Sequence, residues 1–283
     1  MRLNHFILHQ FIIVLLCSNS IFCQNISTNY RVRPHGTLIV GAICKDGILF
    51  ASDSRASFTV GQGSSVKAYA FYENDQKIFT LGKFKIGIAG LSMLNKKFMY
   101  DITYDFNKRY KENENIEKTF VDFIEYLKTN MQLNDSIIFA ENTFIIAGYE
   151  NSKPIILGVN SSKRIRIDSI GRMGHSDEDF KGYLQEAAKV DLICSNLTPI
   201  LASAFVKFSN DKKNNTVGGP IQIIQIKPDN TCIELKSFNP IRYKSYKKMA
   251  KAILRNKLKV KYIYPESKDL LWNTLKEGIR LGY

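Results

Sequence analysis

The sequence predicts an α+β fold, built as a four-layer αββα sandwich in which two antiparallel sheets stack between layers of helices. Three observations lead to this prediction. Strand-like runs come in groups joined by short turns, so they can pair antiparallel without crossover connections. Pairs of helical segments, each with an apolar stripe to bury, separate these groups. Strands and helices do not alternate one by one, as they would in a Rossmann or TIM-barrel fold.

The first predicted element is a β-hairpin. Apolar runs rich in β-branched residues, 37–44 and 48–52, flank Lys45-Asp46-Gly47, and Asp-Gly between two such runs is a strong hairpin signal. Folding the chain about this turn brings Thr37 opposite residues 54–56. Asp53 and Arg55 are two residues apart and therefore share one face of the strand. We expect a hydroxyl, a carboxylate and a guanidinium to meet at this strand end.

The remaining elements follow from hydrophobic periodicity and turn residues. Residues 25–36 predict a linker and residues 58–74 a long loop. Strands are expected at 77–81, 84–89, 136–149, 154–159, 164–172, 221–226 and 232–237. Helices are expected at 94–106, 120–131, 177–193 and 197–208, with two more within 247–282, divided near Pro265. The candidate helix N-caps are Ser176 and either Ser195 or Asn196.

The N-terminal residues predict a secretory signal peptide over 1–23, and therefore export to the periplasm or the extracellular space. Arg2 supplies a positive charge, residues 6–17 are apolar apart from His9 and Gln10, and Ser20 and Cys23 are candidate cleavage points. The apolar run is short for a membrane span, and an uncleaved anchor is the alternative interpretation. Residues 24–36 would then be a propeptide or linker.

Cysteine usage predicts neither a disulfide framework nor a metal site. Of five cysteines, Cys17 and Cys23 belong to the leader, which leaves Cys44, Cys194 and Cys232 without metal-type spacing. We therefore expect no metal and no cofactor.

A strongly basic stretch lies near the C-terminus. The formal net charge is +14, and the segment from Arg242 to Lys261 contains nine Lys or Arg residues and no acid. Such a stretch can contact an anionic surface. However, Ala250, Ile253 and Leu258 recur among the charges at helical spacing, which favours the solvated face of a packed helix. Nucleic acid is not an expected partner of an exported protein.

One motif resembles a known family. Gly36-Thr37-Leu-Ile-Val-Gly, followed by Lys-Asp-Gly-Ile-Leu-Phe-Ala-Ser-Asp-Ser-Arg-Ala-Ser, resembles the mature start of proteasome β-type subunits and of their bacterial two-component relative. These are N-terminal nucleophile hydrolases with an αββα sandwich. The order of the predicted elements fits this family from Thr37 to about Ser237.

The resemblance implies a role for each residue of the motif. Thr37 would be the nucleophile after cleavage of the Gly36–Thr37 bond, and its new α-amine, with an ordinary pKa of about 7.7–8.0, would be the base. Asp53 matches the family's carboxylate and Arg55 its supporting arginine. Lys77, directly before Ile78-Phe79, matches the lysine that lowers the cost of proton transfer. Lys67 competes for this role because the preceding loop is longer than in the family.

The resemblance also extends to the substrate-binding side. Gly87-Ile88-Ala89-Gly90 matches the strand-end glycine run, so the Gly90 N–H would be the oxyanion donor. Ala56 would begin the wall of the pocket for the residue before the scissile bond.

Two short segments depart from the family pattern. Where the family has Gly-Ser-Gly, this sequence has Arg172-Met173-Gly174-His175-Ser176. Where it has Asp-x-x-Ser-Gly-Gly, Asn214 replaces the acid and Val217 the serine. Leu38 replaces a small or hydroxyl residue. His175 or Ser176 are the candidate substitutes for the missing serine.

The resemblance implies an exported, autoprocessed threonine hydrolase that cleaves peptide or small amide substrates. Residues 37–240 would form the hydrolase domain and residues 241–283 a basic helical extension. The family allows a homo-oligomeric ring. The alternatives are a non-catalytic scaffold or binding subunit of the same fold, and a basic surface-binding protein.

Overall fold

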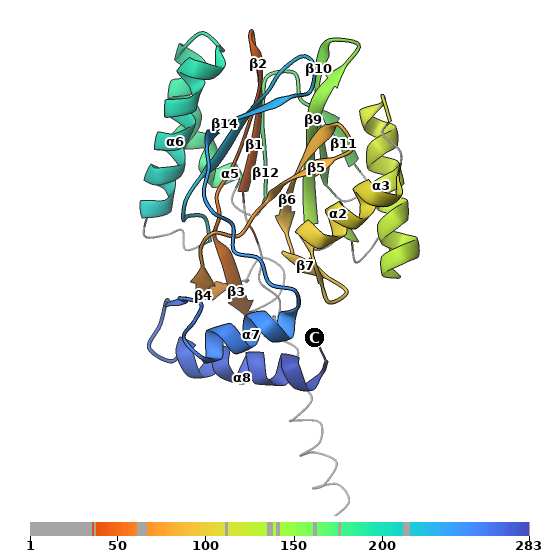
Figure 1. Cartoon of the computed structure of the whole chain (residues 1–283). Helices are drawn as coiled ribbons and strands as arrows, with labels where there is room; N and C mark the ends of the chain where they lie inside the picture. The colour runs from red at the N-terminus through yellow and green to blue at the C-terminus, as the bar shows by residue number, and fades with distance from the viewer. Residues whose placement is uncertain are drawn as a thin grey trace, which may run out of the picture.

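Two five-stranded antiparallel sheets form the centre of the computed structural model, which describes residues 36, 38–60, 67–110, 113–134, 138–139, 142–160, 163–174, 177–211 and 216–282 (Figure 1). The first sheet contains β1 (Leu38–Cys44), β2 (Gly47–Ser52), β12 (Ile170–Gly174), β13 (Gln222–Ile226) and β14 (Cys232–Lys236), in the order β12-β1-β2-β13-β14. The second contains β5 (Ile78–Leu81), β6 (Phe84–Gly90), β9 (Asn142–Glu150), β10 (Lys153–Asn160) and β11 (Lys163–Arg166), in the order β11-β10-β9-β6-β5. The predicted α+β class is confirmed.

The hairpin β1–β2 is confirmed close to its predicted position. Ile39 pairs with Ser52 and Cys44 with Gly47, so the connecting loop consists of Lys45 and Asp46. Gly47 therefore begins β2 instead of lying inside the turn. A Cβ atom at this position would lie 2.9 Å from the Ile226 carbonyl oxygen. Glycine is therefore required here because the backbone packs closely against β13.

The two sheets share an apolar core on their facing sides. Ile39 and Phe50 of the first sheet belong to the same buried cluster as Ile145, Ala147 and Ile156 of the second. β1 and β2 are buried on both faces, and for this reason they are nearly continuous hydrophobic runs instead of alternating ones.

Helices cover the outer side of each sheet (Figure 1). The apolar stripes of α2 (Met99–Arg109) and α3 (Ile116–Met131) pack on the second sheet, with Ile102, Phe123 and Leu127 fully buried. The first sheet is covered by α5 (Asp177–Phe180), the 3₁₀ helix η2 (Lys181–Lys189) and α6 (Cys194–Asn210). The apolar stripe of each of these helices is therefore buried against an apolar face of a sheet.

The predicted loop at 58–74 is wrong. Of its described residues, 58–60 lie in β3 (Ala56–Val60) and 67–72 in β4 (Lys67–Tyr72), and these two strands form a three-stranded sheet with β15 (Lys261–Tyr262). Phe58 and Tyr69 are buried against α7 (Tyr246–Leu254) and α8 (Ser267–Arg280). The two C-terminal helices were predicted, but their packing on this sheet was not.

Several element boundaries also differ from the prediction. Leu94 and Phe98 lie in the small hairpin β7 (Met93–Leu94) and β8 (Lys97–Phe98), because Asn95 and Lys96 turn the chain with positive φ, and α2 starts only at Met99. The predicted strand 136–149 begins at Asn142. The predicted strand 164–172 is two strands, β11 and β12, which belong to different sheets.

The N-terminal caps of two helices were predicted from sequence. Ser195 and Asn196 are not the cap of α6, because the helix starts at Cys194 and its first N–H donates to Asp46 Oδ1 at 2.8 Å. Ser176 lies outside the described residues. So do the leader, residues 25–35 of the predicted linker at 25–36, and the sequence changes at His175 and Asn214.

The basic stretch from Arg242 to Lys261 includes α7, whose apolar side is buried. Met249, Ala250 and Ile253 are at most 1% exposed, as expected for a packed helix with a solvated basic face. Within the described part of the chain, no helix has the length and apolar character needed to cross a bilayer.

Candidate active site

The candidate site is centred on the buried carboxylate of Asp53, which directly follows β2. Its Oδ1 accepts hydrogen bonds from Lys77 Nζ at 2.5 Å and from the Leu38 N–H at 3.3 Å. Its Oδ2 accepts from the N–H groups of Arg55 at 3.2 Å and Gly218 at 3.0 Å. A fully buried carboxylate is expensive to desolvate, and these donors offset that cost.

Lys77 forms a buried ion pair with this carboxylate. Its side chain is 2% exposed and that of Asp53 is 0% exposed. Burial lowers the pKa of Lys77 from its ordinary value, and the negative charge of Asp53 opposes this effect. Lys67 lies exposed at the start of β4, so of the two candidate lysines it is Lys77 that pairs with Asp53.

Lys77 also lies against the backbone of Gly36. A Cβ atom built on Gly36 would approach Lys77 Cε to 2.7 Å and Nζ to 3.4 Å. The Gly36 N–H donates to the Gly90 carbonyl oxygen at 2.5 Å. Thr37 lies outside the described residues, but its two chain neighbours are both held here, since Gly36 contacts Lys77 and Leu38 donates to Asp53.

Gly90 lies at the end of β6, with φ 145°, a value that favours glycine. The hydrogen bond from Gly36 involves its carbonyl group, and the role of its N–H as an oxyanion donor stays a prediction. Ala56, the predicted pocket wall, is fully buried at the start of β3.

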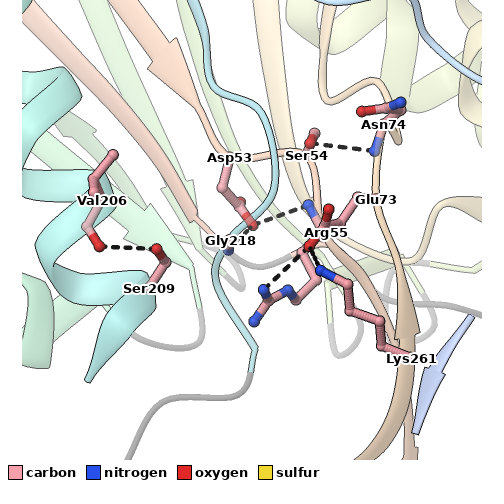
Figure 2. A network of polar contacts seen from close by, with 9 residues as sticks. All are labelled: Asp53, Ser54, Arg55, Glu73, Asn74, Val206, Ser209, Gly218 and Lys261. Carbon is pink, nitrogen blue, oxygen red and sulfur yellow. Dashed lines mark hydrogen bonds and ion pairs between the residues drawn. The ribbon is translucent and has the colours of Figure 1, made fainter. Parts of the chain in front are cut away.

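Arg55 belongs to a second layer of polar contacts around Asp53 (Figure 2). Its Nη2 donates to Glu73 Oε1 at 3.4 Å, and its guanidinium lies 3.9 Å from the centre of the Phe71 ring. The same Glu73 oxygen accepts from Lys261 Nζ at 3.1 Å. One residue of the basic C-terminal stretch is thus connected to the site through Glu73, which the sequence analysis did not single out.

The segment that departs from the family pattern reaches Asp53 through its backbone. Gly218 donates its N–H to Asp53, and a Cβ atom there would approach the Arg55 guanidinium to 2.4 Å. Val217, in place of the family's serine, is fully buried in the core between the first sheet and α6. The hydrogen bond from Gly218 to Asp53 comes from the backbone N–H, so no side chain in the sequence indicates it and a sequence motif could not reveal it.

Asp75 is a second buried carboxyl group that the sequence analysis missed. It accepts hydrogen bonds from Ser92 Oγ at 2.6 Å and from the Tyr72 hydroxyl at 3.4 Å. Burial raises its pKa to about 6, with Ser92 and Lys77 opposing the shift. Together with Gly36, Lys77 and Gly90 it lines a cavity of about 10 Å³, room for about one water molecule.

Comparisons with known proteins assign no family to this arrangement. No family model matches the chain, and no curated protein matches it. The chemical interpretation therefore depends on the residues themselves.

The arrangement is suited to proton transfer and charge stabilisation next to the peptide bond between Gly36 and Thr37. A buried ammonium of lowered pKa, fixed by a carboxylate, lies against the glycine that precedes Thr37. The oxygens of Asp53 are engaged by N–H donors, which is not the environment of a metal ligand. The described residues that could together hold a metal ion are Cys44, Asp46 and Cys194, at the opposite end of the hairpin.

Proposed function

We propose that this chain is an N-terminal threonine hydrolase, matured by cleavage between Gly36 and Thr37 and acting on peptide or amide bonds. The layer order supports the finer fold assignment, since two facing antiparallel sheets carry α2 and α3 on one outer side and α6 on the other. We propose that the fold is the four-layer αββα sandwich of N-terminal nucleophile hydrolases, shared with proteasome β-type subunits.

One observation carries the proposal. The buried Lys77–Asp53 pair lies at the junction on either side of Thr37, with Lys77 against Gly36 and the Leu38 N–H on Asp53. A salt bridge kept only for stability has no need of this position, and buried ion pairs are weak stabilisers compared with apolar contacts. A perturbed lysine next to a hydroxyl nucleophile is instead what covalent catalysis requires.

The proposed chemistry follows from these contacts. The Thr37 hydroxyl loses its proton to the α-amine that cleavage creates, and its oxygen attacks the substrate carbonyl carbon. The Lys77 ammonium stabilises the developing alkoxide, and Asp53 keeps Lys77 in place. The Gly90 N–H stabilises the oxyanion of the tetrahedral intermediate, worth about 3 kcal/mol where such donors have been removed. The amine then protonates the leaving group, and water releases the acyl-enzyme.

The proposed substrates are small or already unfolded peptides, or small amides. This restriction follows from the proposed export through the leader, because outside the cell there is no ATP to drive an unfolding partner. A homo-oligomeric ring is the assembly that we propose with the family assignment.

The deciding experiment is the intact mass of the protein purified from its native compartment. We expect the mature chain to begin at Thr37. Thr37→Ser should be processed at the same bond because it keeps the hydroxyl, whereas Thr37→Ala should retain the bond. A wild-type chain that starts near residues 21–25 with the Gly36–Thr37 bond intact would exclude the α-amine base and favour the non-catalytic scaffold.

Activity is tested on the processed protein. We expect hydrolysis of acyl-amide reporter peptides by the wild type and a loss of about 10²-fold or more in Lys77→Ala protein whose N-terminus has been generated independently by a site-specific protease. A wild-type chain that is processed at Thr37 but hydrolyses no peptide or amide in the library would refute the peptidase assignment.

A further inference from the structure

Two cysteine thiols lie side by side at the far end of the β1–β2 hairpin. Cys44 is the last residue of β1 and Cys194 is the first residue of α6. Their sulfur atoms and a carboxylate oxygen of Asp46 all lie within 4.8 Å of one another. Both thiols are buried and free, at 6% and 0% exposure.

The proximity of the thiols is fixed by the backbone on both sides. The Lys45 N–H donates to the Leu192 carbonyl oxygen at 2.7 Å, and the Cys194 N–H donates to Asp46 Oδ1 at 2.8 Å. The residues that follow Cys44 and those that precede Cys194 are thus bonded to each other. A disulfide requires its sulfurs at about 2.05 Å, so at least one of the two side chains must move for the bond to form.

The same group of atoms is poorly suited to a metal ion. The Asp46 carboxylate already accepts from the Cys194 N–H through Oδ1 and from Gln225 Nε2 at 3.4 Å through Oδ2. A metal ion at this carboxylate would compete with the hydrogen bond at the start of α6. A tetrahedral zinc site also needs a fourth ligand, and the described residues supply only these three.

The two thiols are not chemically equivalent. The neighbouring Cys194 thiol lowers the pKa of Cys44, whereas the hydrogen bond to Cys44 together with burial raises the pKa of Cys194. Only the thiolate form of a cysteine attacks a disulfide.

We propose that Cys44 and Cys194 form an intramolecular disulfide when the chain folds in the presence of a disulfide oxidant. In the first step one of the two cysteines, as its thiolate, attacks one sulfur of a small-molecule disulfide such as oxidised glutathione, and one glutathione thiolate leaves. The other cysteine, as its thiolate, then attacks the cysteine sulfur that is joined to glutathione and expels the second glutathione as a thiolate. Two electrons pass from the cysteine pair to the oxidant, and the two thiol protons end on the released glutathione.

The bond would close a loop of about 150 residues that includes all five strands of the second sheet and the strands β2 and β12 of the first. Cross-links that close long loops restrict the unfolded chain strongly. The inference is independent of the proposed hydrolase activity, because it concerns the opposite end of the hairpin from Asp53.

The test compares oxidised and reduced forms of the full chain. The protein is refolded with a mixture of oxidised and reduced glutathione, so that thiols buried in the native state are accessible while the bond forms. It is then denatured, alkylated and mapped by mass spectrometry without reduction. We expect one peptide pair joined through Cys44 and Cys194, with Cys232 alkylated. The oxidised protein should melt about 5–15 °C above the reduced one.

Matched variants separate this bond from other effects. Cys44→Ala and Cys194→Ala should each abolish the difference in melting temperature between oxidised and reduced protein, and Cys232→Ala should preserve it. Alkylated Cys44 and Cys194 after refolding in the glutathione mixture would overturn the proposal. So would a linked pair that includes Cys232, or stoichiometric zinc in the native protein that is lost in Cys44→Ala.

Discussion

Replacing Asp75 by asparagine should remove a pH-dependent cost of folding. Asp75 is a buried carboxyl group that accepts hydrogen bonds from Ser92 and Tyr72. Asparagine has nearly the same shape, can accept from Ser92 and can donate to the Tyr72 oxygen, but carries no charge at any pH. The variant therefore isolates the titration of this one group.

The magnitude follows from the difference in pKa between the folded and unfolded states. The folded-state pKa of about 6 lies about two pH units above the ordinary value of 3.8, so the folded state binds the proton more tightly. Full ionisation therefore costs about 3 kcal/mol of stability. The stabilisation by the bound proton is present at acid pH and is lost as pH rises through about 6. About 1 kcal/mol is already lost by pH 4.5, which leaves about 2 kcal/mol to be lost between pH 4.5 and pH 8.

The assay is urea unfolding of both proteins across this pH range. The free energy of unfolding of the wild type, minus that of Asp75→Asn, should fall by about 2 kcal/mol from pH 4.5 to pH 8. Asp168→Asn is the matched control, because the Asp168 side chain is 84% exposed, and its difference from the wild type should stay nearly constant. A flat difference for Asp75→Asn would refute the reasoning. A difference that grows with pH would mean that Lys77 outweighs burial.

Two further predictions concern the ion pair and the contact between the sheets. Lys77→Met should lower the free energy of unfolding by about 3–5 kcal/mol, because it leaves the Asp53 charge buried without its cation. Urea unfolding should show a change within about 0.5 kcal/mol for the exposed control Lys67→Met, and equal effects of both variants would contradict the buried pair. Gly87→Ala should lose about 1–3 kcal/mol, because its Cβ would approach Ile39 Cγ2 to 2.5 Å and Phe50 Cζ to 2.9 Å. Thermal melting should leave Gly182→Ala, where nothing lies within 4 Å, at or above wild-type stability, and a Gly87→Ala melt unchanged from wild type would disprove the tight sheet contact.

Elements with a local signal were predictable from the sequence. The hairpin follows from two apolar runs around a short turn, and α3 follows from its apolar stripe, with Asn115 accepting from the Lys118 N–H as its cap. In contrast, β3 and β4 have their apolar side chains covered by α7 and α8, which come almost 200 residues later. Without that distant partner, a run interrupted by Gly and Ser residues resembles a loop.

The same distinction applies to the candidate site. The hairpin pattern located Asp53 and Arg55, but the prediction that they share one face of a strand is wrong, because residues 53–55 lie between β2 and β3. Lys77 follows from the resemblance, and the structure joins it to Asp53. The Gly218 N–H and Glu73 could not be predicted, because their roles depend on backbone direction and on long-range packing. Asp75 follows no recognisable pattern, and only its burial sets it apart.

The contacts of Glu73 and Gly218 have a consequence for biosynthesis. The chain is synthesised from its N-terminus, so Gly36 is made early. The hydrogen bond from Gly218 to Asp53 and that from Lys261 to Glu73 can form only after these much later residues have been translated. β2 likewise acquires its neighbour β13 only after most of the chain has been translated. The surroundings of the Gly36 junction are therefore completed late, so the proposed self-cleavage would not be expected before Lys261 has been translated. A nascent chain stalled before Gly218 would keep its N-terminal segment attached.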